Sequence, residues 1–196
     1  ITSEGVLTFK SAPDYETKSS YTATVTASDG SNSTNQSITV SVTNVNEAPI
    51  FSSASSFSAD ENQLSIGSVT ATDPEGDLLT FSVSDGDLLI TSEGVLTFKS
   101  SPDYETKSSY TATVGVTDGS LIDSQIITVT VIDVDDVAPV FSSTSSFSVE
   151  ENQLSIGVVT ATDIDSDDTS LTFSVSGSDL SITSGGVLTF ATAPDY

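Results

Sequence analysis

Apolar and hydroxyl-bearing residues alternate over short stretches of the chain, which is the pattern of strands with one buried face. In the clearest stretches, 110–116 and 127–131, tyrosine, alanine, isoleucine or valine alternates mostly with threonine. Shorter stretches at 69–71, 79–83 and 96–98 follow the same rule, with turns that contain Gly and Asp between them. No stretch has the 3.6-residue period of an amphipathic helix. The pattern predicts an all-β fold.

Long identical segments recur along the chain. The segment ITSEGVLTF begins at Ile1 and again at Ile90, a spacing of 89, and a copy with one change begins at Ile182. The segment that begins FSS at Phe51 recurs at Phe141, a spacing of 90. A period near 90 is too long for a solenoid repeat and suits a small β-sandwich domain of about seven strands, repeated in tandem.

Two proline-containing segments divide these units. They read NVNEAP (Asn44–Pro49) and DVDDVAP (Asp133–Pro139), and a new apolar strand follows each of them. We therefore expect the second half of one domain at 1–48, a complete domain at 49–138 and the first part of a third domain at 139–196. The plainer explanation of the two partial domains is an excerpt from a longer repetitive chain; the alternative is that two chains placed head to tail complete one domain between them.

Composition excludes many functions. The chain has 28 acidic residues against four lysines, a formal charge of −24, and it contains no His, Cys, Met or Trp. Nucleic-acid binding, Ser-His-Asp and Cys-His catalysis, His or Cys zinc sites, haem ligation and disulfides are therefore not expected. The apolar runs are too short for a membrane span, and the first ten residues contain no secretory signal. An acidic chain without cysteine fits an extracellular protein, and a bacterial one in particular.

The carboxylates concentrate at strand ends. They recur in the PDYE turns, after the two ATD sequences, before Gly at Asp29 and Asp118, and before Asn at Glu61 and Glu151. In extended chain, residues i and i+2 point to the same side, so a D-x-[DE] sequence can present two carboxylates to one cation. Calcium takes six to eight such oxygen ligands. A single D-x-D is usually a solvated turn, but the full recurring set predicts calcium binding.

These motifs together resemble tandem cadherin repeats, of the kind found in large bacterial surface proteins. The matching elements are Glu-Asn in DENQ and EENQ, D-x-E in PDYE, the ATD-x-[DE] turn, the D-G after a long strand, and the linkers that end in A-P-x-F. The resemblance covers the whole chain. It implies seven-stranded Greek-key sandwiches of cadherin or immunoglobulin type, arranged as a rod, with calcium ions between successive domains.

The resemblance also implies a set of ligands at each junction. At the second junction these residues are Glu61, Asp103 and Glu105 below, Asp133, Asp135 and Asp136 in the linker, and Asp163, Asp165 and Asp168 above. At the first junction they are Asp14 and Glu16 below, Asn44, Asn46 and Glu47 in the linker, and Asp73, Glu75 and Asp118 above, with Asp77 as a further candidate. The first linker is one residue shorter and has two neutral Asn, so we expect this junction to lose calcium first.

The predicted function is a calcium-rigidified structural or adhesive array without enzyme activity. Its predicted partners are calcium, neighbouring repeats or copies of the same chain, and a surface glycan or protein receptor. The alternative is a carbohydrate-binding module in which tyrosines of the PDYE segments stack on sugars. The sequence DIDSDD at Asp163 fails as an EF-hand, because Asp168 stands where Gly is required. Asp103 and Glu105 lack an aromatic cleft nearby, so no catalytic pair is assigned.

Overall fold

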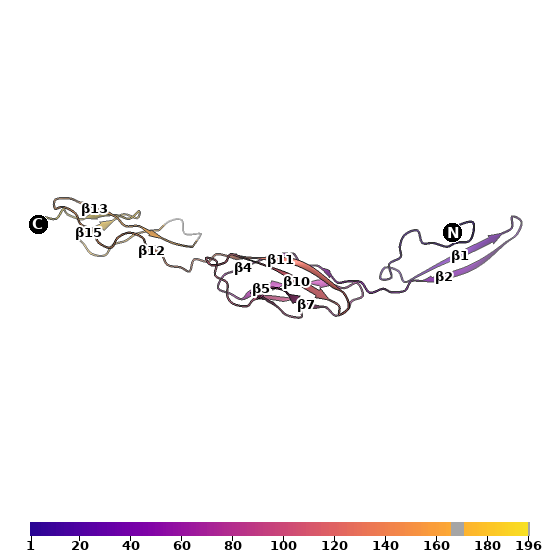
Figure 1. Cartoon of the computed structure of the whole chain (residues 1–196). Coiled ribbons are helices and arrows are strands. Elements are labelled where there is room, and N and C mark those ends of the chain that lie inside the picture. The colour runs from indigo at the N-terminus through magenta and orange to yellow at the C-terminus, as the bar shows by residue number, and fades with distance from the viewer. Residues whose placement is uncertain (166–170, 196) are drawn as a thin grey trace.

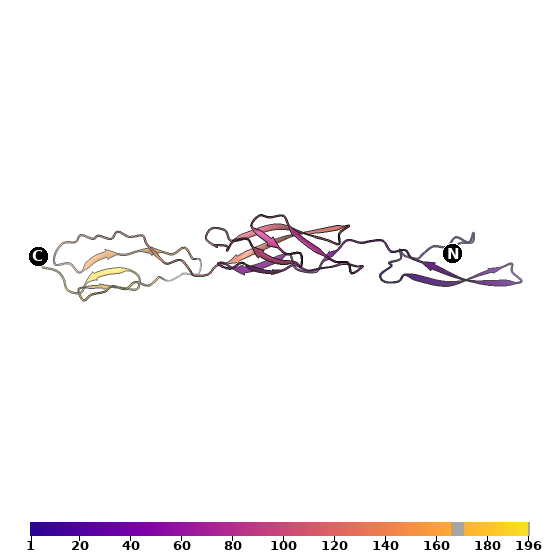
Figure 2. The same ribbon diagram turned by 90° about the horizontal axis from the view of Figure 1, so that it is seen from below.

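The chain forms an elongated row of three β-rich units (Figures 1 and 2), and the computed structural model describes residues 1–165 and 171–195. The described residues form strands and no helix. The N-terminal unit contains β1 (Ser20–Ser28) and β2 (Ser33–Ser41). The central unit contains β3 (Ile50–Phe51), β4 (Ser56–Asp60), β5 (Ser65–Ser68), β6 (Ala71–Thr72), β7 (Thr80–Val83), β8 (Leu88–Ile90), β9 (Val95–Phe98), β10 (Ser109–Thr117) and β11 (Ile122–Ile132). The C-terminal unit contains β12 (Val140–Phe141), β13 (Ser155–Val158), β14 (Ala161–Thr162), β15 (Leu180–Ile182) and β16 (Val187–Phe190).

The central unit is a sandwich of two sheets. One sheet has the order β4-β11-β10-β7, in which β4 runs parallel to β11 and the other pairs are antiparallel. The other has the order β5-β9-β8, and β3 pairs separately with β6. If β3 with β4 and β5 with β6 are each taken as one interrupted strand, the unit has the seven strands expected from the sequence. The all-β prediction is confirmed.

The alternating residues of β10 and β11 explain where the core lies. Val114, Ile127, Val129 and Val131 are almost fully buried, and they pack with Phe98 of the facing sheet. The threonines between them point outward, so each strand has the buried and the hydroxyl face that the pattern predicts. Burying each large apolar side chain contributes roughly 1.5–3 kcal/mol. This core joins the two sheets of the central unit, and the acidic residues lie in the turns at the two ends of those sheets.

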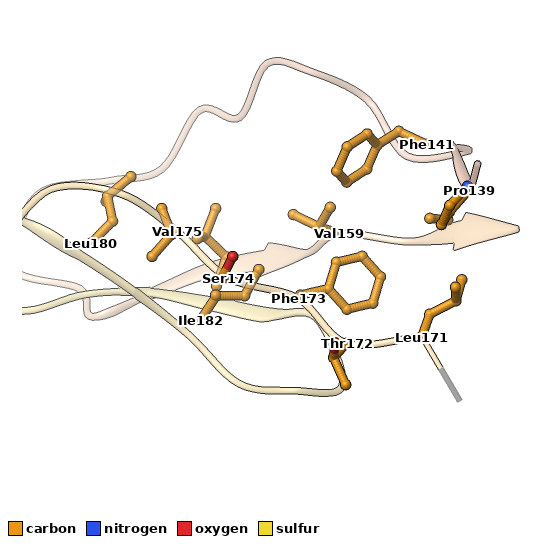
Figure 3. A pocket seen from close by; sticks show the side chains of 12 residues that line it. Pro139, Phe141, Val159, Leu171, Thr172, Phe173, Ser174, Val175, Leu180 and Ile182 are labelled. Atoms are coloured by element: carbon orange, nitrogen blue, oxygen red, sulfur yellow. The ribbon is translucent and has the colours of Figure 1, made fainter. Parts of the chain in front are cut away.

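The C-terminal unit exposes part of its apolar interior (Figure 3). Phe141, Val159 and Phe173 line an open cleft of about 420 Å³, and Phe141 is 70% exposed. Its repeat counterpart in the central unit, Phe51, is partly buried against the core that β10 and β11 complete. The cleft therefore corresponds to one half of a sandwich core.

Candidate metal centres at the unit junctions

At the second junction, carboxylates from three separate parts of the chain converge. Oxygens of Glu105, Asp133 and Asp165 lie within 4.8 Å of one another. They come from the turn that precedes β10, from the linker after β11, and from the segment after β14. A second group, formed by Glu61, Glu105 and Asp136, meets the same distance limit and shares Glu105 with the first. Glu105 thus joins two acidic groups that span the boundary between units.

The backbone holds Glu61 in place. Its side chain is 3% exposed, and its two oxygens accept hydrogen bonds of 2.8 Å from the N–H groups of Tyr104 and Val134. One donor belongs to the PDYE turn and the other to the linker. The buried carboxylate therefore fastens the linker to the end of the central unit, because a buried charge needs such charge-assisted bonds.

Asp165 fastens the linker from the opposite side. It is 4% exposed, and its Oδ2 accepts hydrogen bonds from the N–H groups of Asp136, at 3.1 Å, and Val137, at 3.0 Å. Its Oδ1 is buried and has no hydrogen-bond partner among the described residues. Such an oxygen is costly unless something satisfies it, because nine in ten buried polar groups have a partner.

The donor set fits a hard divalent cation. Besides Asp165 Oδ1, the buried oxygen Glu105 Oε1 has no hydrogen-bond partner in the described part of the chain, and at the first junction the same holds for Asp73 Oδ2 and Glu75 Oε1. Desolvation raises the pKa of Glu105, and repulsion from Glu61, Asp133 and Asp165 raises it further. Carboxylate oxygens without nitrogen or sulfur donors are the ligands that calcium prefers. The residues at this junction can therefore hold calcium.

The first junction gathers a single group of carboxylates. Oxygens of Glu16, Glu47 and Glu75 lie within 4.8 Å of one another, and the Glu47 N–H donates a 3.3 Å hydrogen bond to Glu75 Oε2. Asn44 lines a shallow hollow of about 330 Å³ beside Glu16 and Glu75. Desolvation raises the pKa of Glu16, and the charges of Glu75 and Glu47 add to the effect. This group therefore combines one carboxylate from the N-terminal unit, one from the linker and one from the central unit.

Asn46 makes a different contact at this junction. Its side-chain amide donates a 2.7 Å hydrogen bond to Asp118 Oδ2, in the turn between β10 and β11. The pKa of Asp118 is lowered by hydrogen bonds from the Leu121 backbone, from Asn46 and from the Ser120 backbone. Nearby, Asp73 Oδ1 accepts hydrogen bonds from the N–H groups of Glu75 and Asp77. The amide therefore ties the first linker to the central unit.

Several of the sequence-predicted residues lie outside the three groups. Asp14 and Asp103 each bond to the threonine three residues later, through its N–H and its hydroxyl. Asp163 Oδ1 accepts a 3.3 Å hydrogen bond from the Asp165 N–H. Asp135 lies in the linker between Asp133 and Asp136, and Asp168 lies outside the described residues.

The tyrosines considered for sugar stacking are engaged in packing. Tyr104 and Tyr110 pack against the core of the central unit, and the ring of Tyr110 meets Phe98 edge to face at 5.1 Å. In the N-terminal unit, Tyr21 meets Phe9 in the same way. Tyr15 is 39% exposed. Packing therefore accounts for Tyr21, Tyr104 and Tyr110, and the carbohydrate-binding alternative stays a prediction.

Sequence reasoning assigned no role to Asn62, although the Glu-Asn pair recurs at 61–62 and 151–152. In the structure the Asn62 amide donates a hydrogen bond to Asp136 Oδ2 in the linker. The recurrence of the pair was the available signal. It could not identify the acceptor, which lies 74 residues away in the chain.

Comparison with known proteins identifies the domain type. Residues 46–130 match a family model described as a bacterial Ig domain. Protocadherin Fat 4 of Mus musculus is 33% identical over 183 residues, 82% of this chain and 4% of that protein. Mouse cadherin-23 EC22-24 has a TM-score of 0.65 and 28% identity, over 94% of this chain and 68% of that chain. The chain is therefore an array of repeats that resemble cadherin and immunoglobulin-like domains.

A third relative agrees with the predicted setting of this cadherin-like array. The protocadherin GammaB4 extracellular domain has a TM-score of 0.65 and 25% identity, over 94% of this chain and 33% of that chain. The repeat type is thus extracellular, as the sequence predicts. No helix in the described residues is long and apolar enough to cross a membrane. The named relatives are cadherins rather than enzymes, and a bacterial origin stays a prediction.

Proposed function

We propose that the cadherin-like array is an extracellular spacer or adhesive rod whose junctions are stiffened by calcium. The observation that carries this proposal is the buried Asp165 Oδ1, which has no hydrogen-bond partner among the described residues and belongs to a carboxylate grouped with those of Glu105 and Asp133. Hydrogen bonds already hold Asp165 Oδ2, so the second oxygen is directed by the fold and not by free rotation. A cation is the natural partner for an oxygen held in this way.

The mechanism is electrostatic. Two carboxylates 4 Å apart repel by about 1 kcal/mol in water and about 4 kcal/mol at an effective dielectric of 20. Glu105, Asp133 and Asp165 come from the central unit, the linker and the C-terminal unit, so their repulsion favours separation of the two units. Bound calcium supplies positive charge that all three can share. The chain's own contribution is to pre-position the oxygens through the backbone bonds of Glu61 and Asp165.

The unit boundaries at 48–49 and 138–139 belong to this proposal. In a rod of this kind the three units, 1–48, 49–138 and 139–196, are stiff bodies, and the junctions decide whether the row is straight or flexible. The proposed partners are calcium and neighbouring repeats or copies of the same chain. In this proposal, a stiff rod would support adhesion by holding a binding region of the protein away from the cell surface.

Calcium titration of the chelator-stripped protein tests the proposal. We expect saturable binding by calorimetry, with dissociation constants near the roughly 10⁻⁴ to 10⁻³ M range of extracellular calcium modules. Small-angle X-ray scattering should show a longer and stiffer particle in calcium than in chelator. At a hundredfold excess over Kd, calcium should stabilise the ordered junction by about 2.7 kcal/mol.

Magnesium at equal concentration is the matched control for ionic strength. Because Mg²⁺ demands octahedral geometry and keeps its water, it should neither bind comparably nor lengthen the particle. No heat of binding at millimolar calcium, or the same scattering curve in calcium and chelator, would overturn the proposal.

A further inference from the structure

Asn62 occupies a backbone conformation that few residues adopt. It follows the buried Glu61 and has a φ of 62°, in the left-handed region. Its N–H donates a 3.0 Å hydrogen bond to the carbonyl of Pro102, the first residue of the PDYE turn that carries Glu105. Asparagine and glycine tolerate this region, whereas most side chains are strained there. The turn directs the Asn62 side chain away from the core, which leaves it exposed.

The Asn62 amide reaches the linker. It donates a hydrogen bond to Asp136 Oδ2, and Asp136 is the exposed member of the group that includes Glu61 and Glu105. The backbone N–H of Asp136 bonds to Asp165 of the C-terminal unit. Asp136 is therefore held by its side chain from the central unit and by its backbone from the next one.

The Asp136 carboxylate needs such an anchor. Its group contains two further carboxylates, and their repulsion would turn an exposed side chain away into solvent. The neutral amide of Asn62 can hold the Asp136 carboxylate in place against this repulsion, because it supplies a hydrogen-bond donor without adding negative charge. An aspartate at position 62 would tolerate the turn but repel Asp136. A glycine there would also tolerate the turn but has no side-chain amide to donate to Asp136.

We propose that Asn62 is a positioning residue, which holds Asp136 in the acidic group before a cation arrives and thereby sets the calcium affinity of the second junction. This inference rests on the proposed function, because it concerns the same site. The second copy of the Glu-Asn pair, in the C-terminal unit, supplies an internal comparison. Asn152 has a φ of 64°, and its N–H bonds to the Pro194 carbonyl at 2.8 Å, so the same turn recurs outside the two junctions.

The variant Asn62→Gly tests the role, because glycine keeps the turn and removes the amide. Calcium binding can be followed by NMR of the ¹⁵N-labelled full chain. The N–H groups of Val134 and Val137 report on the second junction and that of Glu47 reports on the first. We expect the Kd at the second junction to rise about tenfold, the equivalent of one hydrogen bond to a charged group. The first junction should be unchanged.

Two further variants separate positioning from general damage to the fold. Asn152→Gly, in the matching turn, should leave both junctions unchanged. In an Asp136→Ala background, Asn62→Gly should cause no further loss of affinity, because its effect acts through Asp136. Thermal unfolding in chelator should confirm that each variant remains folded.

The outcomes distinguish this inference from the proposed function. If the unaltered chain binds no calcium, the proposed function fails and the inference fails with it. If the unaltered chain binds calcium and Asn62→Gly binds it equally well, only the role of Asn62 is overturned. An equal loss with and without the Asp136 side chain would also overturn that role.

Discussion

The two junctions of the array differ in how many carboxylates they bring together. Among the described residues, the first gathers one group of three, whereas the second gathers two groups that share Glu105. Their linkers differ accordingly, with Asn44, Asn46 and Glu47 in the first and Asp133, Asp135 and Asp136 in the second. The second of these groups contains Glu61, so the comparison rests on the linker positions that both junctions have. At those positions the second linker supplies three carboxylates and the first supplies one, so the linker sequence changes the number of acidic ligands available.

The central unit holds both linkers through an amide–carboxylate bond, but the roles are reversed. At its first end it supplies the acceptor Asp118 to the linker amide of Asn46. At its second end it supplies the donor Asn62 to the linker carboxylate of Asp136. The first contact pairs an exposed amide with Asp118, which lies outside the acidic group, whereas the second contact involves a member of an acidic group. We therefore expect the two linkers to depend on calcium to different degrees.

The largest expected effect follows from removing the charge that both groups at the second junction share. Glu105→Gln keeps the size of the side chain and takes one carboxylate from each group. We expect calcium affinity at this junction to fall by more than the roughly 10- to 100-fold that loss of an outer-shell residue costs. NMR titration should show the first junction unaffected. Glu93→Gln, an equal charge change at an exposed residue outside the groups, should change neither junction.

The reciprocal variant completes this test. Glu16→Gln should weaken the first junction and leave the second intact, because Glu16 belongs only to the first group. If either Gln variant weakened both junctions equally, the effect would be one of total charge, and the division into separate centres would be wrong.

A smaller effect is expected from making the first linker resemble the second. Asn44→Asp combined with Asn46→Asp adds two carboxylates beside Glu16, Glu47 and Glu75. In calcium the affinity of the first junction should rise about tenfold, which is near 1.4 kcal/mol. In chelator the same variant should loosen the junction, because Asp at 46 would repel Asp118 instead of donating to it.

A charge-matched variant, Asn32→Asp with Asn35→Asp on and beside β2, controls for the added charge. It should not change calcium affinity at either junction. An equal gain in this control would show that the neutral linker residues do not explain the difference between the junctions. Measurement by scattering in chelator would show whether the first junction has lost order.

The sequence predicts much of this arrangement because the repeat fixes it locally. Alternation identifies β10 and β11, and each acidic group combines residues that the repeat places at the ends of units. Local competition is harder to predict. Asp103 is expected beside Glu105, and in the structure Thr106 donates hydrogen bonds to both of its oxygens, so its place among the ligands stays a prediction. A threonine three residues after an aspartate indicates such a turn. Whether the aspartate bonds to that threonine or also binds a cation depends on the three-dimensional structure, which residue spacing does not specify.

Long-range partners are the other part that the sequence could not supply. The bond between Asn62 and Asp136 depends on how the linker leaves β11, and the bond between Asn46 and Asp118 depends on how the first linker meets the β10–β11 turn. Neither follows from residue type, because exposed asparagines most often bond to local backbone or water.

The smallest expected effect is that of pH, and it acts in opposite directions with and without calcium. The pKa values of Glu105 and Glu16 are raised in the folded chain, mainly by desolvation and further by neighbouring carboxylates. The ordered junction therefore binds protons more readily than the unfolded chain, and protonation relieves the repulsion. In chelator, stability should increase as the pH falls from 7 towards about 4.5 and decrease as the pH rises through the raised pKa values.

In calcium the dependence reverses, because protons compete for the oxygens that bind the metal. Calcium affinity should therefore fall as the pH falls from 7 towards about 5.5, because the raised pKa values make Glu105 and Glu16 take up protons more readily than free glutamates. Unfolding temperatures measured across this range, with calcium and with chelator, should converge at the acidic end. In Glu105→Gln the second junction should lose most of this pH dependence while the first retains it through Glu16. Equal slopes in that variant at both junctions would mean that the raised pKa of Glu105 has no part in the coupling between protons, calcium and order.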